Sequence, residues 1–468
     1  MPADYSRETL YQVVLDRFSG SEGALNLPDP RRQARAWRRR CGGTLAGLTS
    51  RLDYIKELGA SLIWISPLVT NADLPRWDGF HGYWALDFTR QDQRWGPPEH
   101  LDELLAKSKA RGLGVVLDVV VNHTNPIDSK HAGALFVGDR KIADYGNDPE
   151  GIFHHNGFLD LGQAYEPTAW QTQNLHGLAD LNQTNPWVDR HLKQAYTDWL
   201  ERGFTGFRLD TARHVCPTWL SGFANHLWKR RPDALLFGEW WDGGADVEPA
   251  VEFARETGMH LTDFGLSRRL TGALLGQGFE PVADYLALDD RLPDPFSTVT
   301  FLDNHDMPRF LSQARSRGLS AAQARGRLEA GLALLMCLRG IPCIYYGTEQ
   351  YLHQLTRPRG RAPGDDPYNR EPMAGFSQRT PLFEMISRLA HLRRTHPAWG
   401  RHASEVLSVG PAHLVLKRHN LAIGVCLAGD LELALPAPVK ATLWGAPATG
   451  SSLALGGSGF GVWELERS

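Results

Sequence analysis

The chain has 468 residues, with 50 Lys and Arg against 53 Asp and Glu, so its formal net charge is −3. This balance excludes a protein that binds nucleic acid through a large basic surface. Hydrophobic residues make up 42% and charged residues 22%, which is typical of a globular chain and excludes extensive disorder.

Short β-branched runs alternate along the chain with stretches whose apolar residues recur every three to four positions. The predicted strands are Tyr11–Arg17, Ser61–Ile65, Gly114–Val121, Gly206–Asp210, Leu235–Glu239, His260–Phe264, Thr298–Leu302 and Cys343–Tyr346. The predicted helices are Leu48–Leu58, Pro98–Arg111, Trp187–Arg202, Pro217–Arg230, Leu266–Leu275, Ala321–Leu338 and Leu382–Thr395. Eight strands separated by helices predict a parallel sheet that is covered on both faces. A closed (β/α)8 TIM barrel fits this count best, and an open doubly wound sheet is the alternative.

Two segments fall outside the alternation. Residues 123–178 are polar, rich in Gly, Asn and His, and show little periodicity. Connections of that length usually form a subdomain or a functional lid. After about Gly400 the chain changes to short strands with Gly, Pro and Ala turns, at Leu407–Val409, His413–Lys417, Leu421–Cys426, Lys440–Leu443 and Gly461–Leu465. We therefore predict a barrel over residues 1–122 and 179–398, an inserted domain over 123–178, and a C-terminal antiparallel β-sandwich over 399–468.

Carboxylates stand where several predicted barrel strands end. The fourth strand ends in Arg208-Leu-Asp210, the fifth in Gly238-Glu239, and the seventh leads into Asp303-Asn-His-Asp306. A buried carboxylate is costly unless it is paired or functional, and any one of these could equally be a structural ion pair. Because the carboxyl ends of barrel strands form one rim, several such residues together favour an active site.

Cleavage of a glycosidic bond is the chemistry that this set of residues suits. That reaction needs one carboxylate to attack the anomeric carbon and one protonated acid to assist the leaving oxygen. Arg208, two residues before Asp210, would keep Asp210 ionised as the nucleophile. An apolar wall and nearby carboxylates would raise the pKa of Glu239, as a general acid requires. In a retaining site these two carboxyl groups should lie about 5–5.5 Å apart.

Four stretches of this sequence together resemble the signature regions of the α-amylase family of glycoside hydrolases. They are Asp118–His123, Gly206–His214, Gly238–Trp241 and Phe301–Asp306, and they follow one another in that family's order. The resemblance extends from Tyr11 to about His396. It implies a barrel with a domain inserted after the third strand and a β domain at the end.

The resemblance also implies a role for individual residues. Asp210 would be the nucleophile, Glu239 the acid/base and Asp306 the stabiliser of the transition state. Contacts to the sugar chain are implied for Tyr83, His123, Arg208, Arg213, His214, Trp241, His305, Asp366 and Arg370. Of these, Tyr83 would stack beneath the sugar in the cleaved subsite, while Arg213 and Trp241 would lie on the acceptor side.

One structural Ca²⁺ is the cofactor that the resemblance implies. Asn122 and Asp180 match the family's calcium site, with the backbone carbonyls of His214 and Gln171 as further ligands. Ca²⁺ prefers such oxygen ligands, and here it would tie the inserted domain to the barrel. The alternative is that Asn122 and Asp180 merely cap their segments. A second, Asp/Asn-rich calcium loop is not evident between Ser19 and Asp29, so we expect one ion.

Within the family, the flanking sequence looks most like cyclodextrin glucanotransferases and maltogenic amylases. The stretches that carry this likeness are Ala179–Asn182, Gly238–Trp241, Asp303–Met307 and Tyr345–Gln350. Those relatives usually carry two further domains, whereas this chain ends after a single β domain. The family's transferases also place an aromatic residue at the centre of the cleft, and His176 stands there in this sequence.

We therefore expect a retaining endo-type hydrolase of α-1,4-glucosidic bonds in starch and maltooligosaccharides. The first alternative is an α-1,4-glucanotransferase on the same scaffold. The second is a non-catalytic α-glucan-binding protein, which the complete set of Asp210, Glu239 and Asp306 argues against.

The expected partner is thus an α-glucan. No stretch approaches the roughly 18 uninterrupted apolar residues of a membrane span, so no membrane partner is expected. No secretory leader follows Met1, which predicts a cytoplasmic protein unless a leader has been removed. We expect a monomer.

Overall fold

The computed structural model describes residues 3–21, 23, 25, 36–358, 360–457 and 459–466. At its centre eight parallel strands form one sheet in the order β12-β11-β10-β5-β2-β1-β14-β13. Their bounds are β1 Leu10–Val13, β2 Leu62–Ile65, β5 Gly114–Val119, β10 Gly206–Leu209, β11 Leu235–Gly238, β12 His260–Leu261, β13 Val299–Thr300 and β14 Ile341–Tyr345. The two edges meet where the Asp263 amide donates to the Val299 carbonyl at 2.8 Å. The sheet therefore closes, which confirms the predicted barrel and excludes the open sheet.

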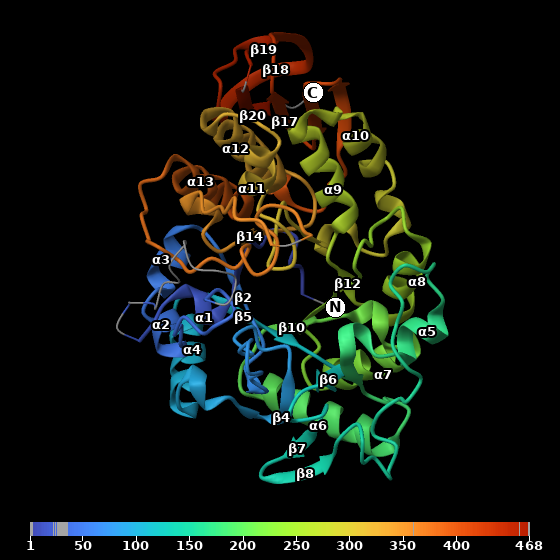
Figure 1. Ribbon diagram of the computed structural model, residues 1–468. Coiled ribbons are helices and arrows are strands. Elements are labelled where there is room, and N and C mark those ends of the chain that lie inside the picture. The colour runs from blue at the N-terminus through green and yellow to red at the C-terminus, as the bar shows by residue number, and fades with distance from the viewer. Residues whose placement is uncertain are drawn as a thin grey trace.

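Helices surround this barrel (Figure 1). Many begin with a proline in the first turn, where the missing N–H costs no hydrogen bond. Their bounds are α1 Leu15–Phe18, α2 Leu45–Thr49, α3 Leu52–Glu57, α4 Pro98–Ala110, α5 Pro167–Thr172, α6 Pro186–Glu201, α7 Pro217–Trp228, α8 Glu248–Thr257, α9 Phe264–Gly272, α10 Glu280–Leu286, α11 Phe310–Ser316, α12 Ala321–Cys337 and α13 Pro381–Thr395. No helix in the described part of the chain has the length and apolar character needed to cross a membrane.

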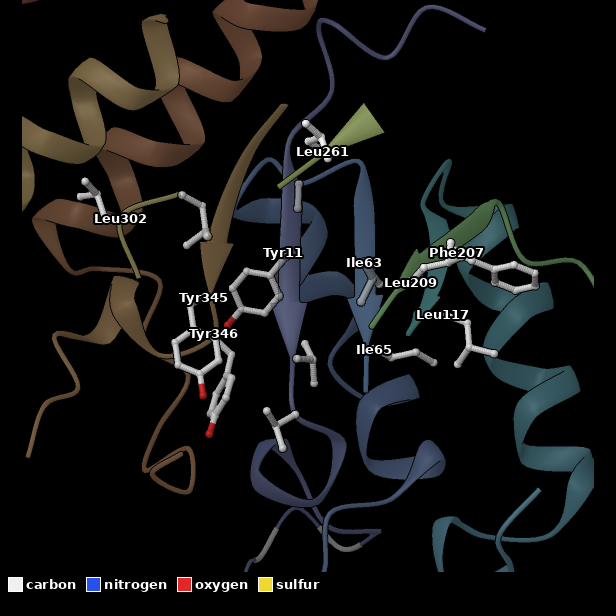
Figure 2. Close-up of a cluster of buried hydrophobic side chains, with 14 of the residues drawn as sticks. Tyr11, Ile63, Ile65, Leu117, Phe207, Leu209, Leu261, Leu302, Tyr345 and Tyr346 are labelled. Atoms are coloured by element: carbon white, nitrogen blue, oxygen red, sulfur yellow. The ribbon is translucent and has the colours of Figure 1, made fainter. Parts of the chain in front are cut away.

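Alternation along the strands separates two apolar cores. Tyr11, Ile63 and Leu117 face the helices and belong to the larger core, part of which is drawn in Figure 2. The lumen holds a smaller core of Leu10, Leu62, Trp64, Val116, Leu235, Phe237, Phe264, Val299, Phe301, Ile341 and Cys343. Since side chains alternate, Gln12, two residues after Leu10, shares the lumen face of β1. The side chains that line the lumen thus change from apolar to polar toward the carboxyl ends of the strands.

Several predicted elements have other bounds in the structure, as two near the N-terminus show. The predicted strand Tyr11–Arg17 is too long, because β1 ends at Val13 and Leu15–Phe18 form a helical turn. That turn is held by Asp16, whose carboxylate accepts from the amides of Cys41 and Gly42. The predicted helix Leu48–Leu58 is two helices, α2 and α3, separated by Ser50 and Arg51.

The segment after β5 leaves the barrel, and its two ends pair with each other. Its first strand, β6 (His123–Pro126), pairs with β9 (Leu178–Asp180), so that His123 is opposite Asp180. Between them lie the hairpin of β7 (Leu135–Val137) and β8 (Arg140–Ala143), and α5. The hairpin lies at the end of the molecule opposite the C-terminal sheet (Figure 1). A further pair, β3 (Val69–Asn71) and β4 (Ala85–Gln91), precedes α4.

The C-terminal strands form one antiparallel sheet in the order β15-β16-β17-β20-β18-β19. Their bounds are β15 Glu405–Val409, β16 His413–Arg418, β17 Leu421–Cys426, β18 Leu431–Gly445, β19 Gly450–Leu455 and β20 Gly459–Leu465. The first part of β18 pairs with β19 and its second part with β20. Leu453 and Leu455 of β19 pack with Val415 and Trp463, so the sheet curls over its own core. The C-terminal β structure is therefore antiparallel, as predicted, but forms one curled sheet, which lies against α12 (Figure 1).

Candidate active site

A single guanidinium organises the carboxyl end of the barrel. Arg208 faces the lumen from β10 and is 1% exposed. Its Nη1 donates to Asp118 Oδ1 at 2.9 Å and to Asp210 Oδ1 at 2.7 Å, and its Nη2 contacts Glu239 Oε1 at 2.6 Å. The three carboxylates come from β5 and from the ends of β10 and β11, which are neighbours in the sheet. One positive charge thus faces three acidic groups in a buried place.

Glu239 follows β11 directly and is nearly buried. Its Oε2 accepts a hydrogen bond from the Thr211 amide at 3.1 Å. Burial raises the pKa of Glu239, with Asp210 and Asp306 adding to the effect and Arg208 opposing it, to about 8. Glu239 therefore carries a proton at neutral pH.

Asp306 is held in the opposite charge state. Arg370 Nη2 donates to its Oδ1 at 3.1 Å, and His305 Nε2 lies 3.0 Å from its Oδ2. Burial acts to raise the pKa of Asp306, but His305, Arg370 and Arg208 outweigh it and hold that pKa below its ordinary value. Arg370 is itself placed by Nε, which donates to the His305 carbonyl at 2.8 Å, and its Nη1 lies 3.6 Å from Asp366 Oδ1. Asp366, Arg370 and Asp306 therefore form one connected group.

Tyr83 links Asp118 to His305. Its hydroxyl donates to Asp118 Oδ2 at 2.7 Å and lies 2.7 Å from His305 Nε2. The two rings are stacked with centroids 5.5 Å apart. Burial raises the pKa of Asp118 to about 7, with Asp210 adding to the rise and Arg208 opposing it.

Two residues of this network were given no role by sequence reasoning. Asp118 accepts from Trp64 Nε1 at 3.0 Å in addition to its bonds with Arg208 and Tyr83. The only local signal for Asp118 is a carboxylate inside the apolar run Val115–Val121. Trp64 carries no such signal, because an aromatic residue in an apolar strand usually only packs.

The remaining predicted sugar contacts surround this group. The ring of His123 bonds the Tyr83 carbonyl through Nε2 at 3.2 Å, and His214 bonds the Trp170 carbonyl through Nδ1 at 3.2 Å. Arg213 lies over the ring of Trp170 at 3.9 Å and donates to the Trp241 carbonyl at 3.2 Å. One nitrogen of the Arg213 guanidinium is thus bound within the protein, whereas the indole of Trp241 is 39% exposed.

Two buried oxygens at the base of the inserted segment have no hydrogen-bond donor among the described residues. They are Asn122 Oδ1 and Asp180 Oδ1. The other oxygen of Asp180 lies 2.7 Å from His154 Nδ1. Burial raises the pKa of Asp180 to about 7, against the lowering effect of His154 and Asn122. Unpartnered oxygens of this kind fit a hard cation.

Amide and backbone oxygens would have to complete such a cation site. Residues 3–21, 23, 25, 36–358, 360–457 and 459–466 contain no cluster of three or more His, Cys, Asp or Glu able to hold a metal. Gln171 lies in α5, next to Trp170, whose carbonyl meets His214. Most of the stretch Ser19–Asp29, where a second calcium loop is not expected, lies outside the described residues.

Comparison with known proteins gives relatives over most of the chain. Residues 12–252 and 283–399 match the model of the alpha amylase catalytic domain. An alpha-amylase of Niallia circulans is 30% identical over 97% of this chain and 88% of its own length. A cyclomaltodextrin glucanotransferase of Niallia circulans is 31% identical over 97% of this chain. This chain spans only 63% of that relative and 56% of one from Bacillus sp. (strain 1-1).

A solved structure matches nearly the whole chain. It is the crystal structure of CldA, described as the first cyclomaltodextrin glucanotransferase with a three-domain ABC distribution. The two chains are 32% identical with a TM-score of 0.88, and the match covers 98% of this chain and 99% of CldA.

Proposed function

Because this chain belongs to the α-amylase family of glycoside hydrolases, we propose that it cleaves internal α-1,4 bonds of starch and maltooligosaccharides with retention of configuration. One observation carries the proposal. Arg208 binds Asp210 and Glu239 through its two terminal nitrogens, while the surroundings keep a proton on Glu239. Carboxyl groups that share one guanidinium lie close together, as a nucleophile and an acid on the same bond must.

The reaction follows from these charge states. Asp210 attacks the anomeric carbon, while Glu239 passes its proton to the leaving glycosidic oxygen, which breaks the bond and leaves a glycosyl ester on Asp210. Glu239, now a carboxylate, takes a proton from water as that water attacks the same carbon and releases Asp210. Asp306, kept ionised by Arg370 and His305, faces the positive charge that develops on the sugar ring.

Hydrogen-bonding side chains around the carboxylates would hold the sugar. His123, His305 and Arg370 are buried beside Tyr83 and Asp306. Trp241 offers an exposed aromatic face on the acceptor side. Arg213 supports this face through the Trp241 carbonyl, so we assign it to positioning Trp241 and not to direct sugar binding.

We also propose one structural Ca²⁺ at Asn122 and Asp180, with the carbonyls of His214 and Gln171 as further ligands. The donor-free oxygens of Asn122 and Asp180 support this proposal. When bound, the ion would fasten the inserted segment to the barrel and would take no part in bond cleavage. The alternative, that the two residues only cap their segments, predicts that a calcium chelator leaves the thermal midpoint unchanged. We expect chelation to lower that midpoint in the natural protein and to have little effect in Asp180→Asn.

Glucan transfer is the second candidate, because several relatives bear the name cyclomaltodextrin glucanotransferase. CldA, described with a three-domain distribution, carries that name, so domain number does not argue against transfer. Hydrolysis is favoured by His176, which is exposed and adopts a φ of 51° in the turn before β9. A glucan would meet an imidazole there and not the large aromatic surface expected of the family's transferases.

Timed product analysis with maltoheptaose tests the proposal. Linear short maltooligosaccharides, released with the α-anomer first by proton NMR, would support a retaining hydrolase. Cyclic products, or products longer than the substrate, would assign the chain to the transferases. Binding of maltoheptaose without any turnover would overturn both and leave a glucan-binding protein.

A further inference from the structure

A buried amide lies directly behind the active site. Gln12 faces the lumen from β1 and is 2% exposed, above a layer in which Leu10 and Leu62 are apolar. A polar group in such a place costs free energy unless it is hydrogen-bonded. The Nε2 atom of Gln12 lies 2.6 Å from Nδ1 of His305. The Oε1 atom of Gln12 has no hydrogen-bond partner in the described part of the chain. The bond to His305 is therefore what Gln12 gains from this position.

The other nitrogen of His305 determines the direction of that bond. Nε2 lies 3.0 Å from Asp306 Oδ2, and a carboxylate oxygen can only accept. It also lies 2.7 Å from the Tyr83 hydroxyl, whose own hydrogen points to Asp118. Both neighbours require a hydrogen on Nε2. In a neutral imidazole Nδ1 must then be the acceptor, and Gln12 must present its amide hydrogens to it.

We propose that Gln12 is a positioning residue that fixes His305 in the tautomer carrying its hydrogen on Nε2, aimed at Asp306 and at the sugar. The inference rests on the proposed glycosidase function for its effect on catalysis. It assigns a role in the active site to the first barrel strand, which supplies none of the three catalytic carboxylates.

The charges around His305 are consistent with a neutral ring. The charged groups near the ring are Asp306, Arg208 and Arg370, and Asp118 is connected to it through the Tyr83 hydroxyl. Tyr83 is stacked on the ring and His81 is stacked on Tyr83. Burial lowers the pKa of His305 to about 3, with Arg208 and Arg370 lowering it further and Asp306 opposing them. The tautomer, and not the charge, is then what a neighbour of Nδ1 can set.

Gln12→Met keeps the size of the side chain and removes its hydrogen bond. We expect kcat to fall by up to about 100-fold, because His305 can then carry its hydrogen on either nitrogen, while KM changes by less than about threefold. Leu10→Met, on the same strand and the same lumen face, is the matched control and should leave kcat within about twofold. Equal kcat values for the two variants would overturn the proposal. Circular dichroism of both checks that they fold.

Gln12→Glu gives a signature that a purely structural role would not. The new carboxyl and the imidazole share one proton. With that proton bound, a hydrogen remains on Nε2 and the enzyme works. Once this shared proton is lost, the one hydrogen left on the imidazole lies on Nδ1, where it is donated to the carboxylate of residue 12, and Nε2 carries no hydrogen. Activity of Gln12→Glu should thus decline at a lower pH than that of the natural protein, and an unchanged pH profile would contradict the proposal.

A readout without turnover separates this inference from the proposed function. The ¹⁵N shifts of labelled histidines, with His305 assigned by its loss in His305→Gln, report which ring nitrogen carries the hydrogen. We expect the Nε2–H pattern in the natural protein and its loss in Gln12→Met. An Nδ1–H pattern would overturn the inference even if the enzyme cleaves maltoheptaose. Conversely, Nε2–H in a protein without turnover would refute the proposed function alone.

Discussion

Two regions of this molecule bury arginines almost completely, but the arginines bind carboxylates in one region and backbone carbonyls in the other. Arg208, in the active site, is bound by the carboxylates of Asp118, Asp210 and Glu239. Arg393 of α13 and Arg418 of β16 lie where the barrel meets the C-terminal sheet, and within the described ranges neither forms an ion pair. Their guanidiniums instead donate to the backbone carbonyls of Ser6, Met336, Cys337, Leu338, Gly340, Gly400 and His402.

The partners decide what each region can do. Carboxylates can take up and release protons, and in the active site the surroundings raise the pKa of Glu239 and lower that of Asp306. Carbonyl dipoles cannot change charge. Burial lowers the pKa of Arg393 and of Arg418, and a neighbouring guanidinium lowers each pKa further. These two arginines bind the carbonyls at the end of α12, which carry the negative end of the helix dipole. The first region performs chemistry, and the second joins three parts of the chain.

The largest effect is expected from removing the nucleophile. Asp210→Asn keeps the shape of the side chain and a partner for Arg208, but an amide cannot attack the anomeric carbon. We expect turnover of maltoheptaose to fall by more than about 10⁴-fold. Arg208 retains Asp118 and Glu239, so the circular dichroism spectrum should not change. Residual turnover above about 1% would refute the assigned role of Asp210.

The next effect concerns the proton on Glu239. In the natural protein kcat/KM should fall as the pH rises through about 8, because Glu239 then loses the proton that the leaving group needs. Glu239→Gln should lower kcat by about 10²- to 10⁴-fold and abolish this decline at alkaline pH. The pH dependence of both proteins on maltoheptaose is the measurement. A variant that keeps the same alkaline decline would show that another group is the acid.

Exchanging Arg for Lys in each region sharpens the comparison. Arg208→Lys keeps the charge but loses the planar guanidinium that binds three carboxylates at once, and we expect kcat to fall by about 100-fold. Because Arg208 lowers the pKa of Glu239, a more distant charge should also move the alkaline decline to higher pH. Arg418→Lys, the matched exchange, should leave kcat within about twofold. Equal losses from the two exchanges would mean that Arg208 acts only on stability.

Local sequence patterns predict the active site better than the contacts behind it. Arg208 and Asp210 are two residues apart at a strand end, and parallel strands bring such ends to one rim. Gln12 and His305 are 293 residues apart, and Arg418 and Cys337 are 81 apart, so no local pattern pairs them. β19 and the first half of β18 were missed, because Pro436 and Pro438 argue against a strand and many side chains there are exposed.

The smallest expected effect tests the region that no motif marks. Arg418→Met fills a similar volume but leaves the carbonyls of Cys337, Gly400 and His402 without their donor. We expect the free energy of unfolding to fall by about 2 kcal/mol, since unpaired buried carbonyls cost more than the removal of a buried charge returns. Arg401→Met is the control, because Arg401 is 45% exposed and its bond to Asp294 is screened by water. Denaturant unfolding with turnover measured alongside should separate the two regions. A stable Arg418→Met protein with reduced kcat would show that Arg418 influences the active site. Carboxylate partners would then not distinguish a catalytic arginine from a structural one with carbonyl partners.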